Sequence, residues 1–226
     1  MIMAKAKPLE EILSYLEGFQ RILVLGCNGC VAVCEAGGLK EAEVLASALR
    51  IQNMQAGDRR DIQELSLTRQ CDKEYLAELK DKMDNYDAVV SLACGAGVQF
   101  MAEMYTEKPI FPGVDTCFIG VTEEQGVWTE RCQACGQCIL AETGGICPIM
   151  RCAKRMMNGP CGGSEKGKCE ISVLVGRDVD CGWHLIFERL KKLGQIGRFA
   201  EPALDKDWTL SRDGGPRLII REDVRP

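Results

Sequence analysis

Fourteen cysteines in 226 residues constrain this chain more than any other feature of its sequence. Eight of them lie between Cys132 and Cys181, in a glycine-rich stretch without clear strand or helix periodicity. An even number of cysteines would suit disulfides in a small secreted domain. This chain is not small, Glu10, Glu11 and Glu17 interrupt its first apolar segment, and its thiols come in closely spaced groups. We therefore expect a cytoplasmic protein whose thiols bind metal in a reducing compartment.

The densest cysteine pattern is the run Cys132-x2-Cys135-x2-Cys138. Thiolates at this spacing around a tight turn can reach three corners of one cubane iron–sulfur cluster. Bacterial ferredoxins close such a run with a Cys-Pro pair after three residues, whereas Cys147-Pro148 comes here after eight. We include Cys147 among the predicted ligands.

Further downstream, single cysteines bring this region to two full sets of four thiols: Cys152, Cys161, Cys169 and Cys181. Structural zinc typically takes paired Cys-x2-Cys knuckles, and only the first group has that form. Three alternatives remain, namely two clusters, one cluster with one zinc ion, or zinc alone. We favour two [4Fe–4S] clusters, with zinc as the replacement for one of them.

The first half of the chain alternates between short apolar runs and segments with helical spacing. Strands are expected at 21–25, 62–67 and 88–92, helices at 9–16, 39–49, 76–83 and 98–105, and an extended stretch at 109–121. Alternation of strands and helices implies a parallel sheet with helices on its faces. We expect an α/β fold with a Rossmann-like parallel-sheet domain over residues 1–128.

The second predicted domain, residues 129–226, is rich in cysteine and should be organised by the metal that it binds. It ends in a helix at 183–193 and an extended polar tail. The tail contains one apolar patch, Leu218–Ile220, flanked by Arg217 and Arg221. This patch is either a partner-binding strand or an edge strand of the same domain.

Cysteines also follow the predicted strands of the first domain. Cys27, Cys71 and Cys94 follow the first, second and third strands, and Cys117 lies near the fourth. Because ligands of parallel sheets bind outside the carboxyl ends of the strands, all four could face one crevice.

The run Cys27-x2-Cys30-x3-Cys34 offers three ligands for a third cluster, with Cys94 or Cys71 as the fourth. We assign Cys94 to the site. We interpret Cys117 and the other member of the Cys71 and Cys94 pair as buried free cysteines.

Several classes of function lack the residues that they need. A net charge of −5 gives no positive field for nucleic acid, and no uncharged stretch is long enough to span a membrane. The nucleotide fingerprint G-x-G-x-x-G, the P-loop, G-x-S-x-G and H-E-x-x-H are absent. The single histidine, His184, is interpreted as a helix-surface residue. We expect no catalytic residues on this chain.

Beyond the spacing of single cysteines, longer motifs of the second domain carry a family resemblance. They are Cys132-Gln-Ala-Cys-Gly-Gln-Cys138, Thr143-Gly-Gly-Ile-Cys-Pro148, Asn158-Gly-Pro-Cys-Gly-Gly163, Cys169-Glu170, Asp180-Cys-Gly-Trp183 and Glu188-Arg-Leu-Lys191. This region resembles the methylenetetrahydrofolate reductase C-terminal domain family, and the whole chain is similar to the MetV-type small subunits of acetogens.

The resemblance implies a complex with a TIM-barrel flavoprotein that reduces methylenetetrahydrofolate to methyltetrahydrofolate in the methyl branch of the acetyl-CoA pathway. Flavin and folate would be bound by that partner, and this chain is too short to contain a barrel of ~250 residues as well. The chain would be a non-catalytic subunit with two or three clusters, supplied by ferredoxin or a larger electron-transfer complex. A zinc-stabilised assembly subunit without electron transfer is the alternative.

Overall fold

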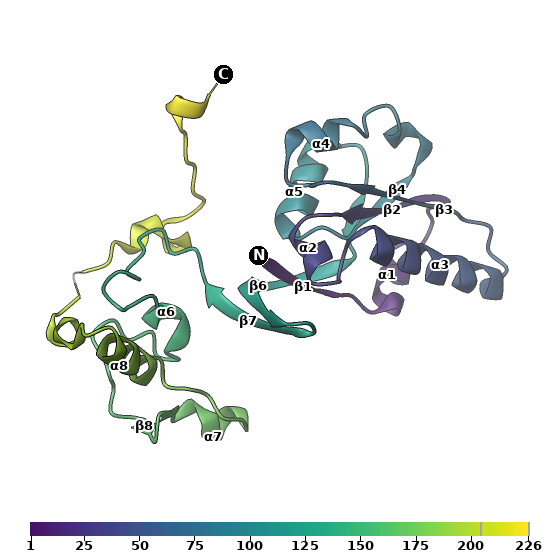
Figure 1. Ribbon diagram of the computed structural model, residues 1–226. Helices are drawn as coiled ribbons and strands as arrows, with labels where there is room; N and C mark the ends of the chain where they lie inside the picture. Colours follow the sequence, from purple (N-terminus) through teal and green to yellow (C-terminus); the bar gives the residue numbers. More distant parts are fainter. Residues whose placement is uncertain (204, 226) are drawn as a thin grey trace. The chain divides into compact units, whose positions relative to one another are not determined.

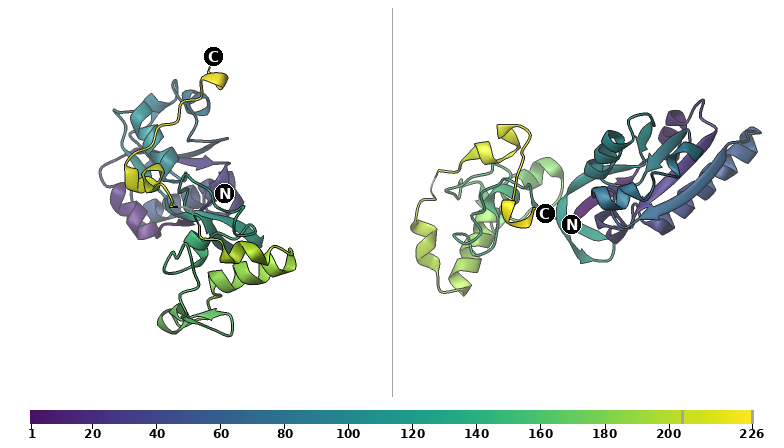
Figure 2. Two further views of the ribbon diagram at one scale, coloured as in Figure 1. Left: turned by 90° about the vertical axis from the view of Figure 1, so that its left-hand side faces the viewer. Right: turned by 90° about the horizontal axis from the view of Figure 1, so that it is seen from above.

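The computed structural model describes residues 1–203 and 205–225. The chain divides after Thr129 into two compact units, which we call the sheet unit (residues 1–129) and the cysteine unit (from residue 130) (Figures 1 and 2). None of the described helices is long and apolar enough to cross a membrane.

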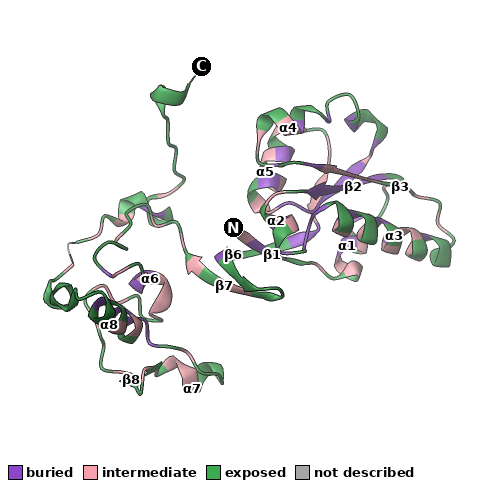
Figure 3. Ribbon diagram, viewed as in Figure 1, coloured by how far each residue is buried: buried purple, intermediate pink, exposed green. Residues whose placement is uncertain are grey.

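A parallel four-stranded sheet forms the centre of the sheet unit, as the sequence predicted. Its strands are β2 (Arg21–Cys27), β3 (Asp61–Leu67), β4 (Ala88–Ser91) and β5 (Ile110–Pro112), in the order β3-β2-β4-β5. Strand β2 is buried from Ile22 to Cys27 because both of its faces are covered (Figure 3). The sheet therefore has two separate apolar clusters, one on each face.

Helices divide between these two faces. One face carries α1 (Leu9–Tyr15), α2 (Cys30–Val33) and α3 (Leu39–Ala56). The other face carries α4 (Lys73–Ala77), the 3-10 turn η1 (Met83–Asn85) and α5 (Gly95–Met104). Ile22 and Val24 pack with residues of α1, α2 and α3, whereas Leu23 and Leu25 pack with residues of α4, η1 and α5. The alternation of β2 side chains assigns each helix to its face.

Helix α4 is shorter than the spacing of its apolar residues predicted. It ends at Ala77, and a turn leads into η1, yet Leu79 and Met83 are still buried. Inward-facing residues at helical spacing identify a buried face, whereas the hydrogen-bonded length of the helix depends on the turn that follows.

A second, antiparallel sheet was not predicted. It contains β1 (Ile2–Ala6), β6 (Val114–Glu124) and β7 (Val127–Cys132), in the order β1-β6-β7. The extended stretch at 109–121 therefore does not complete the parallel sheet as a single strand, because β5 ends at Pro112. A Cβ atom at Gly113 would lie 2.4 Å from Leu92 Cδ2, so glycine lets the chain pass close to this side chain where it leaves the parallel sheet.

The cysteine unit has short elements joined by long loops. They are α6 (Pro148–Arg151), β8 (Ser164–Glu165), β9 (Lys168–Cys169), α7 (Ile171–Val175), α8 (Gly182–Lys192) and the 3-10 turns η2 (Ile196–Ala200), η3 (Trp208–Leu210), η4 (Arg212–Gly214) and η5 (Glu222–Val224). Helix α8 lies within one residue of its predicted bounds, and its side chains Trp183, Ile186 and Leu190 form the small core together with Cys181.

The apolar patch of the C-terminal tail does not form the edge strand that was one of its two predicted roles. Leu218, Ile219 and Ile220 are exposed by 83%, 84% and 57% and pair with no strand in the described part of the chain. The prediction of an edge strand in this domain is wrong, because nothing beside these residues offers a backbone partner. Their predicted role in partner binding stays a prediction.

Candidate metal centres

Three cysteines of the sheet unit meet at the carboxyl edge of the parallel sheet. Cys27 is the last residue of β2, and Cys71 and Cys94 follow β3 and β4; the three strands are neighbours in the sheet. Partial burial of its thiol is the first cause that raises the pKa of Cys71, and the thiolates of Cys94 and Cys27 raise it further. The three sulfur atoms are therefore close enough to sense one another's charge, as expected for ligands of one crevice.

A buried glutamine, Gln70, ties the three strand ends together. Its Nε2 atom donates to the carbonyl oxygens of Leu25 and Gly26, each at 3.0 Å, and its Oε1 atom accepts a hydrogen bond of 2.6 Å from Ser91 Oγ. Gln70 is fully buried and directly precedes Cys71. Sequence analysis missed this residue, since a single glutamine in a loop carries no motif.

The other two cysteines of the N-terminal run lie differently. Cys34 is buried, and its sulfur accepts a hydrogen bond of 3.4 Å from the backbone nitrogen of Ala4 in β1 and contacts Val31 O at 3.5 Å. Cys30 is exposed at the first residue of α2. The structure thus places Cys34 against β1, and Cys71 beside Cys27 and Cys94. The ligand roles of Cys30 and Cys34 stay predictions.

The interpretation of the remaining thiols as buried is wrong. Cys117 is exposed, because it is the extra residue of a β-bulge where Met3 pairs with Phe118 and Ala4 with Thr116. Cys71 is exposed and Cys94 half-buried. Cys27, at the end of β2, is the exception, since it is buried in the apolar cluster of one sheet face.

In the cysteine unit, the residues from Cys132 to Cys138 form a tight turn. Ala134 and Gly136 both have positive φ angles, of 54° and 83°. The Ala134 backbone nitrogen donates to Cys132 Sγ at 3.3 Å, so the turn already directs an amide toward a sulfur. Cys132 and Cys138 are exposed, and Cys135 is half-buried.

The C-terminal tail packs onto this turn. Arg217 Nη1 donates to the carbonyl oxygen of Ala134 at 2.6 Å, and Lys206 Nζ donates to that of Gln137 at 2.7 Å. A Cβ atom at Gly136 would lie 2.3 Å from Leu210 O, so the tail approaches the turn closely at a glycine. Sequence analysis did not foresee these contacts.

Four further cysteines surround one small cavity of about 120 Å³: Cys152, Cys161, Cys169 and Cys181. Cys152 ends α6, Cys169 lies on β9, and Cys181 directly precedes α8. Lys154 also lines the cavity, and its pKa is raised first by its hydrogen bond to the Glu170 carboxylate and then by the Cys161 thiolate. An ion pair of Lys154 and Glu170 therefore lies beside this group of thiols.

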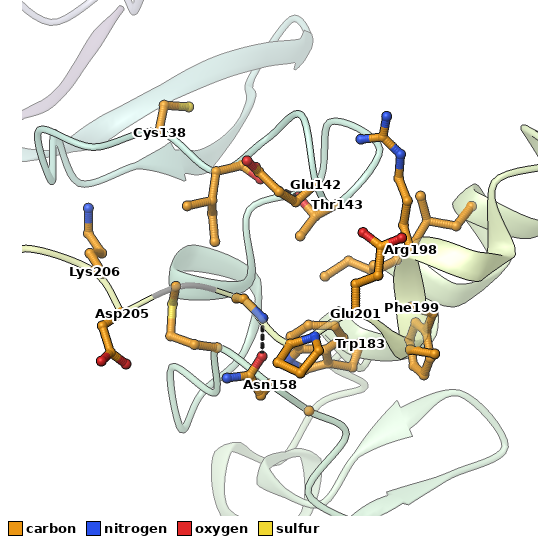
Figure 4. Close-up of a pocket in the computed structure, with 18 of the residues that line it drawn as sticks. Cys138, Glu142, Thr143, Asn158, Trp183, Arg198, Phe199, Glu201, Asp205 and Lys206 are labelled. Atoms are coloured by element: carbon orange, nitrogen blue, oxygen red, sulfur yellow. Dashed lines mark hydrogen bonds between the residues drawn. The ribbon is translucent and has the colours of Figure 1, made fainter.

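A larger cavity of about 470 Å³ lies next to the first and is drawn in Figure 4. Cys138 lines it, and Trp183 packs edge-on against Phe199 with ring centroids 5.7 Å apart. The Trp183 indole donates to Met156 O at 2.9 Å, which fixes the ring. Trp183 lines both cavities and so stands between Cys138 and the four-cysteine group.

Cys147 lines neither of these cavities and directly precedes α6. His184 lies on the exposed side of α8, where its ring packs against the glycine turn at Gly167, in agreement with a surface role. Within residues 1–203 and 205–225, no three histidine, cysteine or acidic side chains are arranged to hold a metal ion. The ligand assignments therefore stay predictions.

The donor set nevertheless fits iron–sulfur clusters or zinc in its chemistry. Soft thiolates select zinc and iron–sulfur clusters, whereas calcium and magnesium take oxygen ligands. In the cysteine unit, Gly163 and Gly182 stand where a Cβ atom would lie 2.2 Å from the Glu170 carboxylate and 2.7 Å from the Arg151 backbone. These close approaches bring the loops of Cys161 and Cys181 toward Cys169 and Cys152.

Residues 111–209 match the family model described as methylene-tetrahydrofolate reductase C terminal. The resemblance that the cysteine motifs predict is therefore confirmed for this segment, which includes all eight cysteines of the cysteine unit. No curated protein and no solved structure matches the chain significantly.

Proposed function

We propose that this protein is an iron–sulfur electron-transfer subunit of a methylenetetrahydrofolate reductase. The observation that carries the proposal is that thiols gather at two places, the strand ends of the sheet unit and the cavity of the cysteine unit, within a chain linked to that reductase by residues 111–209. Its setting would be the cytoplasm, where thiols remain reduced.

Thiolates without accompanying histidine pairs are the usual ligands of [4Fe–4S] clusters, which accept and donate single electrons when bound. In this proposal the chain's own residues hold the carriers in place and exclude water from part of their surroundings. A low-potential carrier such as ferredoxin supplies two electrons, one at a time. They pass to the flavin of a TIM-barrel partner, and that partner reduces methylenetetrahydrofolate to methyltetrahydrofolate.

The charges near the thiols are consistent with this role. Four thiolates around a cluster leave net negative charge, and a nearby cation favours the reduced, more negative form. Arg69 near Cys71 is such a cation, and Lys154 next to Cys161 is another, whose charge Glu170 partly offsets. The proposal needs no general acid, general base or nucleotide site on this chain.

Metal analysis of the anaerobically purified chain tests the proposal. We expect about eight iron atoms and as many acid-labile sulfides, from two four-iron clusters, with a further four if the sheet unit binds a third. The reduced protein should show an electron paramagnetic resonance signal and should transfer electrons from ferredoxin to the partner's flavin. Zinc without sulfide, or methylenetetrahydrofolate reduction by the chain alone, would contradict the proposal.

The second candidate is a zinc-stabilised assembly subunit. It is favoured by the small core of the cysteine unit, in which the buried apolar cluster is Cys181, Trp183, Ile186 and Leu190. A domain with so few buried side chains needs additional stabilisation, and structural zinc supplies it without electron transfer. Colourless protein with one or two zinc ions per chain, still needed for the partner's stability, would establish this candidate.

A further inference from the structure

We infer that Cys152, Cys161, Cys169 and Cys181 form one four-thiolate metal centre of their own, separate from the turn at Cys132–Cys138. This inference rests on the proposed function for the identity of the bound group, a [4Fe–4S] cluster. The grouping itself rests on how the structure packs these four residues.

Two observations group the four cysteines. Cys181, Cys152 and Cys169 belong to one apolar cluster together with Trp183, and all four cysteines line the same cavity. They come from four different segments, since the closest pair in sequence, Cys161 and Cys169, is eight residues apart. Segments that are far apart in sequence converge here around sulfur.

Backbone contacts tie these segments together. The Cys169 nitrogen donates to Val179 O and the Cys181 nitrogen to Gly167 O, both at 2.8 Å. The Glu170 nitrogen donates to Gly163 O at 2.9 Å, which joins the Cys161 loop to the same hairpin. The glycines at positions 163 and 182 permit the close approaches described above. These backbone contacts and glycines hold the segments that carry the four thiols near one another.

The size of the cavity favours a cluster over a single ion. Zinc lies ~2.3 Å from each of its thiolates, so its ligands leave almost no space between them. The cavity between the four thiols has a volume of about 120 Å³, which leaves room for more than one atom. The ion pair of Lys154 and Glu170 also lines this space.

The turn at Cys132–Cys138 belongs to a different neighbourhood. Its contacts are with the tail residues Lys206, Leu210 and Arg217. Trp183 lies between the two, because it lines the four-thiol cavity on one side and the cavity of Cys138 on the other. The cysteine unit thus has one group of thiols on each side of this indole.

Cysteine-to-serine variants of the full chain, purified anaerobically, test the grouping through iron, sulfide and zinc content. Cys152→Ser, Cys161→Ser, Cys169→Ser and Cys181→Ser should each lose one cluster, about four irons. The double variant Cys161→Ser/Cys169→Ser should lose no more than either single variant. Cys161→Ser/Cys135→Ser should lose two clusters, because independent sites add. Cys117→Ser is the matched control and should keep full metal content.

Thiol labelling of the unmodified protein gives a second measurement that does not depend on a variant's folding. As a chelator removes metal, the four thiols should become reactive together, at a different chelator concentration from Cys132, Cys135 and Cys138. Independent exposure of the four, or exposure of Cys161 with the turn, would overturn the grouping. A double variant within the group that loses twice the metal would do the same.

These results separate the grouping from the proposed function. If zinc replaces iron but leaves in the same all-or-none way, the grouping stands and the electron-transfer role fails. If iron is present in full and the four variants act independently, the role stands and the grouping fails.

Discussion

The two units place their cysteines by different physical means. In the sheet unit, two apolar clusters cover a four-stranded sheet; Cys27 and Cys34 are two members of a large aliphatic cluster, and Cys71 is exposed at the sheet edge. In the cysteine unit, the single small cluster includes Cys152, Cys169 and Cys181 themselves. One unit can fold first and then bind metal, whereas the other needs its thiols for its core. We therefore expect the sheet unit to fold without metal and the cysteine unit to need metal for its fold.

Removal of metal should give the largest difference in stability between the two units. Structural metal can contribute ~10 kcal/mol or more to the folding of small metal-binding domains, so the cysteine unit should unfold under an anaerobic chelator. The sheet unit should remain folded on its own clusters. Hydrogen exchange measures this, with full exchange expected in Gly182–Lys192 and continued protection in Arg21–Cys27. Equal protection of both segments after metal removal would contradict it.

Loss of one ligand should have the next largest effect. Cys135→Ser replaces the middle thiolate of the turn with a harder, poorly matched ligand. Iron should fall by about four atoms, and reduction of the partner's flavin by ferredoxin should be abolished. An artificial dye that reduces the flavin directly should still support turnover, because it bypasses this chain. Full iron content and normal ferredoxin-driven reduction would show that Cys135 is not a ligand.

In the sheet unit, the buried side chain of Gln70 should contribute strongly to the free energy of unfolding. Gln70→Ala leaves the Ser91 hydroxyl and two carbonyl oxygens without their buried partner. The free energy of unfolding of this unit should fall by about 3 kcal/mol, measured by denaturant titration. Metal content of the cysteine unit should not change. Gln55→Ala, at an exposed position of α3, is the matched control and should be neutral. Equal stability of the two variants would contradict this role.

The close approach of Gly182 to the Arg151 backbone should affect the metal affinity of the cysteine unit. Gly182→Ala would place a Cβ atom 2.7 Å from the Arg151 carbonyl, between Cys152 and Cys181. Overpacking of this kind costs about 2 kcal/mol, which exceeds the gain in helix propensity of alanine over glycine. Metal affinity should fall accordingly, measured by competition with a chelator. Gly197→Ala, which has open space around it, should leave affinity unchanged.

The contact between the tail and the turn should give the smallest effect. Arg217→Ala removes the hydrogen bond to Ala134 O, and a bond worth ~1 kcal/mol should speed cluster loss from the turn about fivefold. Arg221→Ala is the control, since Arg221 pairs only with its neighbour Asp223 in the described contacts. Absorbance decay in air measures both rates. Equal rates would show that the tail does not stabilise the turn.

Much of the sheet unit could be predicted because its signals are local. The apolar run Arg21–Cys27 and the alternation of strands with helices indicate a parallel sheet directly. Strand β1 was missed because Ile2–Ala6 is short and has no partner nearby in sequence; its partner is β6, more than a hundred residues away. Contacts between segments so far apart in sequence cannot be predicted from the local spacing of apolar residues.

The amino-acid sequence by itself determined the parallel sheet, the thiol chemistry and the resemblance of residues 111–209 to a reductase family. These follow from side-chain type and short-range periodicity. Only the tertiary structure decided that Cys71 lies beside Cys27 and Cys94, that Cys34 faces β1, and that the last four cysteines share a cavity. The physical reason is that spacing limits which neighbouring thiols can meet, whereas distant segments are brought together by strand order, buried polar bonds and the few glycines where backbones touch.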